Sequence, residues 1–341
     1  MKIKILCTLG PASLRPDVIE ALNSRGIDLF RINMSHTPLE AVEEIVDLVR
    51  RHSSSPISLD TEGAQVRCGR LDGDVTLRDG ERLLLTPADI VGTGRELTLR
   101  PASIFGSLRP GALVSIDFDG ALLEVNGVGQ EGAEATVIDG GRIKSNKAVN
   151  IDPAPELPPL TEKDEEAIEL GLRLGLDHFA LSFAGSAENV ALLRAMIGPE
   201  AHLMSKIESR AGVRNMADII PASDAVLIDR GDLSREIPLE HVPFYQKVIV
   251  REANRWSRPV FVATNLLESM VTNRRATVAE ANDIANTLLD GVHGLVLAAE
   301  TAVGRDPVGS MDMVLSSIRA FERSHLSTLL EEDRALPAEV L

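Results

Sequence analysis

The sequence predicts an α/β protein built as a (β/α)8 barrel, the TIM-barrel class, with a small β-barrel-like domain inserted after the third strand. Eight short apolar runs recur along the chain, and a helical pattern follows each of them, directly or after an insertion. Buried runs that lack strict polar alternation and are separated by helices indicate βα units with a parallel sheet. Eight such units favour a closed barrel over an open sheet. Aromatic residues make up only 3% of the chain, so the core is expected to be aliphatic, as in parallel sheets covered by helices.

The expected elements follow one another in the order that a barrel requires. The expected strands are Ile3–Cys7, Leu29–Ile32, Ile57–Leu59, His178–Leu181, His202–Ser205, Ala225–Ile228, Val260–Ala263 and Gly294–Leu297. The clearest helical patterns are Pro16–Asn23, Leu39–Arg51, Glu162–Leu174, Ala187–Met196 and Pro307–Glu322.

One interval is far too long for a loop. Between the third strand and the helix that begins near Glu162, about 100 residues intervene, where a βα loop has only a few. Turn signals such as Asp72-Gly73, Asp119-Gly120 and Gly140-Gly141 separate short apolar runs there, which indicates a small all-β domain. We therefore expect a barrel of residues 1–69 and 145–325, an inserted domain of residues 70–144 and a short acidic tail of residues 326–341. Because the insertion follows a barrel strand, it is expected to act as a lid over the active face, with a passive decoration as the alternative.

Charge and cysteine content narrow the classes of function. The formal net charge is −16 and no Lys/Arg run occurs, so nucleic acid and anionic membrane surfaces are disfavoured partners. A protein this acidic that takes anionic substrates needs a local cluster of cations or a bound metal. The chain has only two cysteines, Cys7 and Cys68, which do not indicate a disulfide framework. No apolar stretch of the sequence is long enough to span a membrane. A cytoplasmic protein is expected.

Polar residues gather directly after the strand runs. They are Arg31, Asn33, Ser35 and His36 after the second run, Asp60, Thr61 and Glu62 after the third, Ser182 after the fourth, Lys206 and Glu208 after the fifth, Arg230, Gly231 and Asp232 after the sixth, Thr264 after the seventh, and Glu300 and Thr301 after the eighth. If the barrel closes, the carboxyl ends of its strands meet at one face, so these residues are expected to point into one pocket.

Glu208 and Asp232 are candidate ligands of a divalent metal. Oxygen-only ligands on neighbouring strand ends suit Mg²⁺ or Mn²⁺, and no His/Cys spacing typical of zinc is present. The alternative is that each carboxylate only caps the helix that follows it.

Two cations and one backbone amide are candidates for binding an anion. Lys206 ends an apolar strand, where an ammonium is costly unless it is paired, either with substrate or in a structural ion pair with Glu208 or Asp232. Arg31 at another strand end can clamp a phosphate with two nitrogens. The backbone N–H of Gly231, in a turn before a helix, can contact a carboxylate or phosphate.

Four oxygen-bearing side chains on adjacent strands allow two interpretations. Asn33, Ser35, Asp60 and Thr61 could bind a monovalent cation or could form a hydrogen-bonded network at the top of the barrel. His36 could touch a ligand or be an ordinary loop histidine.

The order and spacing of many separated motifs resemble the pyruvate kinase family. These motifs are Cys7–Ser13, Arg31–His36, Leu59–Gly63, Leu157–Asp164, Ser205–Glu208, Arg230–Leu233, Ala263–Met270 and Ala299–Ala302. The resemblance runs from about residue 3 to residue 323, and the inserted β domain falls where that family carries its mobile B domain.

The resemblance implies transfer of a phosphoryl group from phosphoenolpyruvate to ADP, with Mg²⁺ (or Mn²⁺) and a potassium ion. Lys206 would stabilise the phosphoryl group in transit and the enolate oxygen, Glu208 and Asp232 would hold the divalent metal, and Thr264 would help to relay a proton. The implied phosphate and substrate contacts are Arg31, Arg67, Lys206, Gly231, Asp232 and Thr264. The implied nucleotide contacts are Arg31, His36 and Lys147, and the implied potassium ligands are Asn33, Ser35, Asp60 and Thr61.

Several positions depart from the family's pattern. Glu62 stands where the family has a lysine, and Gln65 stands where a glutamate or lysine tracks potassium dependence, which leaves that dependence open. Ser182–Ser186 lacks two cations, Arg274–Val278 departs from the usual subunit contact, and Ala298–Thr301 replaces a Ser-Gly-Glu-Thr motif. No C-terminal domain follows the barrel in this sequence. The family's effector site and one of its subunit interfaces are therefore expected to be missing. Whether the chain forms a homodimer is left open. Two other functions share the same residues: a metal-dependent lyase that uses an enolpyruvate, and a non-catalytic sensor of a phosphorylated metabolite.

Overall fold

The computed structural model describes residues 2–117 and 120–324. The chain forms two compact units, one made of residues up to Gly63 and from Pro159 onward, the other of residues Ala64–Pro158. Each unit is described by itself.

The larger unit contains a closed barrel of eight parallel strands in the order β1-β17-β16-β15-β14-β13-β3-β2, which confirms the predicted fold class. The strands are β1 (Lys4–Thr8), β2 (Leu29–Asn33), β3 (Ile57–Asp60), β13 (His178–Leu181), β14 (His202–Ile207), β15 (Ala225–Asp229), β16 (Val260–Ala263) and β17 (Gly294–Leu297). All of the expected strands are present, with their ends shifted by no more than two residues.

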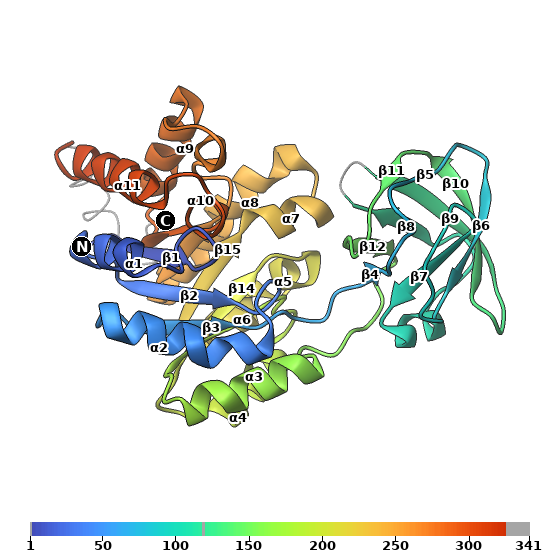
Figure 1. Cartoon of the computed structure of the whole chain (residues 1–341), viewed down its shortest axis with the longest axis horizontal. Helices are drawn as coiled ribbons and strands as arrows, with labels where there is room; N and C mark the ends of the chain where they lie inside the picture. The colour runs from blue at the N-terminus through green and yellow to red at the C-terminus, as the bar shows by residue number, and fades with distance from the viewer. Residues whose placement is uncertain (1, 118–119, 325–341) are drawn as a thin grey trace. The chain divides into compact units, whose positions relative to one another are not determined.

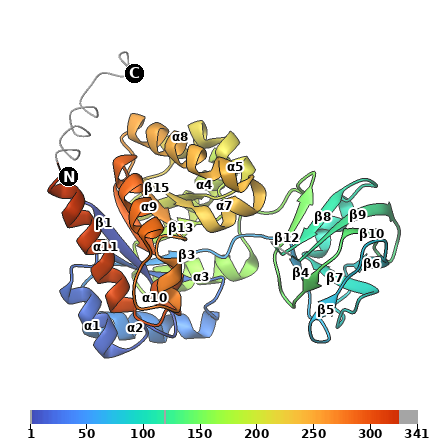
Figure 2. The same ribbon diagram turned by 90° about the horizontal axis from the view of Figure 1, so that it is seen from above.

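Helices surround the barrel on its outer side (Figure 1). They are α1 (Pro16–Ser24), η1 (Leu39–Ala41), α2 (Val42–His52), α3 (Glu162–Arg173), α4 (Ala187–Ile197), α5 (Arg210–Arg214), α6 (Met216–Ala222), α7 (Arg230–Glu236), η3 (Leu239–His241), α8 (Val242–Arg255), η4 (Glu268–Val271), α9 (Val278–Leu289), α10 (Ala299–Ala302) and α11 (Pro307–Glu322). The last of these, α11, packs against both α9 and α1, so the end of the barrel sequence meets its beginning (Figure 2).

The interior of the barrel is filled by a small apolar cluster that is separate from the layer under the helices. Its members are Leu6, Leu29, Ala180, Met204, Ala225, Leu227, Phe261, Ala263 and Val296. Side chains alternate between the two faces of a strand, so the residue two positions later also points inward. Those later residues include Thr8, Arg31, Ser182, Lys206 and Asp229, all at the carboxyl ends of strands. The alternation that fills the core therefore also directs these polar side chains into the mouth of the barrel.

The loop after β3 is held by one buried carboxylate. Asp164 is fully buried in the first turn of α3, where it forms a capping box with Thr161. Its oxygens also accept hydrogen bonds from the backbone N–H groups of Glu62 (2.6 Å) and Gly63 (3.1 Å). Because a buried carboxylate needs such donors, this contact fixes the loop against the helix.

In its described residues, the smaller unit consists of strands and one 3-10 helix. A seven-stranded sheet has the order β12-β8-β9-β10-β6-β7-β4, and β11 pairs with β5. Its elements are β4 (Arg67–Cys68), β5 (Val75–Thr76), β6 (Arg82–Thr86), β7 (Glu96–Arg100), η2 (Ala102–Gly106), β8 (Leu113–Ile116), β9 (Ala121–Val128), β10 (Ala133–Asp139), β11 (Arg142–Ile143) and β12 (Val149–Asp152).

The boundaries of the inserted unit differ from the expected residues 70 and 144. The unit begins at Ala64 and ends at Pro158 because β4 pairs with β7 and β12 pairs with β8, which draws both flanking segments into the small sheet. The expected acidic tail, residues 326–341, lies outside the described residues. Within the described part of the chain, no helix has the length and apolar character needed to cross a bilayer.

Candidate active site

Lys206 places a buried positive charge in the mouth of the barrel. Its side chain is only 7% exposed, and its Nζ lies 3.0 Å from Glu208 Oε2 and 3.8 Å from Asp229 Oδ2. The same Nζ donates a hydrogen bond to Ser182 Oγ (3.1 Å). Burial opposes the charged form, but the carboxylates of Glu208, Asp229 and Asp60 outweigh burial and raise the pKa of Lys206 above its ordinary value. The ammonium is therefore a fixed cation at neutral pH.

Three carboxylates approach one another beside this ammonium. Glu208, Asp229 and Asp232 each offer one oxygen, and these oxygens lie within 4.8 Å of one another. Glu208 and Asp229 are buried, whereas Asp232 is partly exposed and pairs with Arg235 at 2.9 Å. A cluster of oxygen ligands with room for water is the kind of site that Mg²⁺ or Mn²⁺ prefers.

Glu208 tests whether this cluster fits a metal ion. The side chain is fully buried, and its Oε1 accepts a hydrogen bond from the Phe183 N–H (2.8 Å). Its Oε2 has no hydrogen-bond partner among the described residues, although Lys206 Nζ is close enough for charge attraction. Burial raises the pKa of Glu208, and the neighbouring Asp232 and Asp229 carboxylates add to this effect against the opposing Lys206. A buried carboxylate oxygen without a donor, facing other carboxylates, fits a cation.

Thr264 follows β16 in a strained backbone conformation. Its φ is +66°, a region that β-branched residues rarely adopt. Its Oγ1 accepts a hydrogen bond from the Gly231 N–H (2.7 Å) and lies within donating distance of Asp229 Oδ1 (3.0 Å) and the Ala263 carbonyl oxygen (2.6 Å). Its own carbonyl accepts two hydrogen bonds from the Arg230 guanidinium, at 3.1 and 2.7 Å. Strain that is held in place by so many bonds is typical of functional positions.

Arg230→Met should destabilise the protein by about 2–3 kcal/mol, because it removes the charged donors to the Thr264 carbonyl and leaves Asp283, 2.9 Å from the guanidinium, without its partner. Urea unfolding measures this change. Arg25→Met is the matched control, since the pair of Arg25 and Asp312 is well exposed and is worth less than about 1 kcal/mol. Equal losses in the two variants would contradict the supporting role of Arg230.

Arg31 reaches the mouth from β2, as predicted, and forms a buried ion pair with Asp60 of β3. Its Nε donates to Asp60 Oδ2 (3.0 Å), its Nη2 contacts the same oxygen, and its Nη1 donates to Thr8 Oγ1 (3.1 Å). The Asp60 carboxylate, one of the predicted potassium ligands, is therefore already paired with the Arg31 guanidinium.

The remaining predicted potassium ligands make local hydrogen bonds. Asn33 Oδ1 accepts from the Ser35 N–H (3.0 Å). Thr61 Oγ1 accepts from the Ser182 N–H (2.9 Å), and the Thr61 carbonyl accepts from Ser182 Oγ (2.6 Å). These are separate local hydrogen bonds, so both interpretations, the hydrogen-bonded network and the potassium site, stay predictions.

Comparison with known proteins identifies the family. The family model described as the barrel domain of pyruvate kinase matches residues 1–311. The chain belongs to the pyruvate kinase family. Among its relatives, pyruvate kinase of Geobacillus stearothermophilus is 36% identical over 323 residues, which cover 90% of this chain and 54% of the relative. Pyruvate kinase of Methylorubrum extorquens is 37% identical, covering 93% and 68%, and that of Thermococcus litoralis is 34% identical, covering 94% and 70%. The chain thus spans between about half and about 70% of these pyruvate kinases.

Two residues at the mouth of this pyruvate kinase barrel have no predicted role: Ser182 was expected at the mouth without one, and Asp229 was not expected there. Asp229 and Ser182 both contact Lys206. A signal for each was present: Asp229 comes two positions after the interior residue Leu227, and Ser182 comes two positions after Ala180. The strand period of two places both side chains inward.

Three predicted binding residues, His36, Arg67 and Lys147, have their described contacts with residues other than Lys206 and the carboxylates beside it. His36 is exposed in the turn after β2, where its backbone N–H donates to the Asn33 carbonyl (3.1 Å). Arg67 and Lys147 were expected in the barrel domain, but both belong to the smaller unit because β4 and β12 join its sheet. There Lys147 pairs with Asp117 at 2.8 Å, and Arg67 donates to a backbone carbonyl at 3.2 Å.

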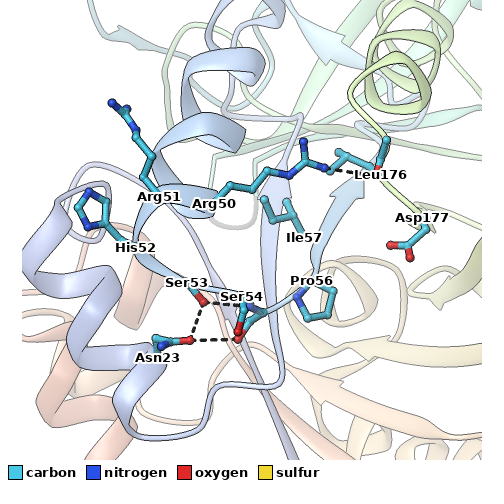
Figure 3. A pocket seen from close by; sticks show the side chains of 12 residues that line it. Asn23, Arg50, Arg51, His52, Ser53, Ser54, Pro56, Ile57, Leu176 and Asp177 are labelled. Carbon is cyan, nitrogen blue, oxygen red and sulfur yellow. Dashed lines mark hydrogen bonds between the residues drawn. The ribbon is translucent and has the colours of Figure 1, made fainter.

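A cavity of about 720 Å³ opens at the opposite end of the barrel (Figure 3). Its lining is Asn23, Arg50, Arg51, His52, Ser53, Ser54, Ser55, Pro56, Ile57, Gly175, Leu176 and Asp177. Helix α2 ends there, so its free carbonyl groups disfavour an anion despite the basic side chains. His52 already pairs with Glu20 at 2.7 Å. In barrels of this class the active site lies at the other face, with Lys206.

Proposed function

We propose that this chain transfers a phosphoryl group from phosphoenolpyruvate to ADP, giving pyruvate and ATP. The observation that carries the proposal is the buried Lys206 ammonium beside the carboxylates of Glu208, Asp229 and Asp232 at the active face of a pyruvate kinase barrel. Phosphoryl transfer depends on positioning and on neutralising charge more than on covalent chemistry. The fixed Lys206 ammonium, next to a site for a divalent cation, supplies both the positioning and the neutralisation of charge.

Glu208 and Asp232 would hold Mg²⁺ or Mn²⁺, and the ion would neutralise charge on the phosphoryl and enolate oxygens. Lys206 would stabilise the same oxygens through its ammonium, which is already held in the mouth by Ser182 and Glu208. Arg31 would contribute a second cation, although its charge is shared with Asp60. Each of these side chains is in place before substrate arrives, which reduces the cost of reorganisation.

Thr264 would act where the enolate carbon gains a proton. Its hydroxyl is oriented by the Gly231 N–H and lies 3.0 Å from Asp229 Oδ1. The Gly231 N–H therefore has a partner already, and an anion bound there would compete with the Thr264 hydroxyl.

The remaining roles are part of the same proposal. Phosphate and nucleotide contacts would come from Arg31, His36, Arg67 and Lys147, with the smaller unit as a lid, and potassium would bind at Asn33, Ser35, Asp60 and Thr61. Glu62, the charge reversal relative to the family, lies 3.2 Å from Lys163, so its negative charge is balanced within the barrel. This balance is compatible with an anionic substrate in the mouth.

A coupled assay tests the function. Pyruvate should form from phosphoenolpyruvate only when a nucleoside diphosphate and Mg²⁺ or Mn²⁺ are both present, and several diphosphates with and without K⁺ should identify the preferred acceptor and the potassium requirement. Metal-dependent exchange of the methyl protons of pyruvate without nucleotide-dependent turnover would favour a lyase. Binding of phosphoenolpyruvate with neither reaction would favour a sensor.

A further inference from the structure

We propose that Asp229 is a third metal-binding carboxylate, which completes with Glu208 and Asp232 a site that takes a hard divalent cation before substrate binds. The inference rests on the proposed divalent metal site and adds a ligand that neither the sequence motifs nor the resemblance supplied. It concerns how the cation is held in the free protein.

The two oxygens of Asp229 have different surroundings. Oδ1 accepts from the Gly231 N–H (3.2 Å) and lies 3.0 Å from the Thr264 hydroxyl, so it is bound to the protein. Oδ2 makes no hydrogen bond with the described residues, and its ion-pair partner is Lys206 Nζ at 3.8 Å. The side chain is thus oriented by one oxygen and offers the other.

An independent observation points to a ligand at the same place. Glu208 Oε2 is buried and accepts no hydrogen bond from the residues that the structure describes, with the Lys206 ammonium 3.0 Å away, whereas Glu208 Oε1 is held by the Phe183 N–H. Glu208 and Asp229 therefore share one arrangement, in which one oxygen binds the backbone or a hydroxyl and the other faces the cluster. This arrangement preorganises two ligand atoms.

The three carboxylates of the cluster outnumber the buried cations that lie beside them. Three carboxylates lie beside one buried ammonium, Lys206. The nearby Arg31 guanidinium is paired with Asp60, and Arg235, which is 45% exposed, pairs with Asp232. Carboxylates that are this close and this buried repel one another unless a cation lies between them. A third carboxylate also favours a hard, oxygen-seeking ion and strengthens its binding through the added charge.

The test is a titration with Mn²⁺ alone, without substrates, followed by the loss of the electron paramagnetic resonance signal of the free ion. Asp229→Asn keeps the size and one acceptor oxygen but removes the charge, and it should raise the dissociation constant about tenfold or more. Asp177→Asn, the same change at the opposite end of the barrel (Figure 3), should leave the constant unchanged. Thr264→Val removes the hydroxyl beside Asp229 Oδ1 and should also bind Mn²⁺ nearly normally, whereas an equal loss there would show that Asp229 acts only by positioning Thr264.

A crystal of the unaltered protein soaked in Mn²⁺ gives a readout that does not depend on the folding of a variant. Anomalous scattering should place the ion about 2.0–2.3 Å from Asp229 Oδ2. An ion bound to Glu208 and Asp232 but remote from Asp229, or an unchanged constant in a folded Asp229→Asn variant, would overturn this inference alone. Failure of the unaltered protein to bind Mn²⁺ at all would instead remove the metal site on which the proposed function depends.

Discussion

Lys206→Met should lower kcat for pyruvate formation from phosphoenolpyruvate by at least about a thousandfold while Mn²⁺ remains bound. The ammonium is the buried cation nearest to the carboxylate cluster, and a methionine of similar length fills its space without charge. Loss of a fixed charge that stabilises the reacting oxygens affects the transition state more than the ground state, so kcat should fall far more than KM rises. Steady-state kinetics and a Mn²⁺ titration on the same preparation separate the two effects.

Lys2→Met is the matched control for this substitution. Lys2 lies just before β1, at the opposite end of the barrel, and its pair with Asp28 is exposed on the lysine side. Its removal should change neither kcat nor Mn²⁺ affinity. A Lys206→Met variant that retained turnover within a few-fold of the unaltered protein would show that the charge stabilising the reaction comes from elsewhere, with Arg31 as the next candidate.

The strands and the location of the site could be predicted because both depend on local patterns. Runs such as Ala225–Ile228 are apolar on both faces, as strands covered by helices must be. The polar residues after them meet at one face because all eight strands are parallel. Lys206 and Glu208 could therefore be placed together from the sequence, and their separation of 3.0 Å agrees with that placement.

The parts that could not be predicted depend on contacts between segments far apart in the chain. Thr264 gives no sign of its positive φ, because that conformation is held by Arg230 and Gly231 of the preceding βα unit. The ion pair of Arg31 and Asp60 follows from the register of β2 on β3, which no single motif encodes. The boundary near residue 64 was missed because β4 is only two residues long and its pairing strand lies about thirty residues later.

Asp229 shows how a family pattern can hide a residue. Arg230–Leu233 resembles a motif of the family, whereas Asp229 lies between that motif and the expected strand Ala225–Ile228 and belongs to neither. Strand geometry gives it a definite direction, inward, two positions after Leu227. Chemical roles at a barrel mouth are therefore better sought along each inward-facing row than within motifs alone.

Glu208→Gln should weaken Mn²⁺ binding about a hundredfold, more than Asp229→Asn, because Glu208 is the most buried member of the cluster and the amide has no charge to give the ion. Turnover at a fixed Mn²⁺ concentration should fall with the occupancy of the site. Glu20→Gln, the same change on the exposed face of α1, is the control and should leave binding unchanged.

Stability measurements decide whether Glu208 is a ligand or only a partner of Lys206. The variant keeps an oxygen for the Phe183 N–H, and Asp229 still faces Lys206, so the metal-free protein should change in unfolding free energy by less than about 2 kcal/mol. Mn²⁺ at about 100 times the dissociation constant of the unaltered protein should stabilise that protein by about 2.7 kcal/mol, and at the same concentration it should stabilise the variant by only about 0.4 kcal/mol. A purely structural carboxylate would give the reverse: a large loss in the metal-free protein and the same gain from Mn²⁺ in both. Only a metal ligand should combine a small change in the stability of the metal-free protein with a large loss of the stabilisation by Mn²⁺.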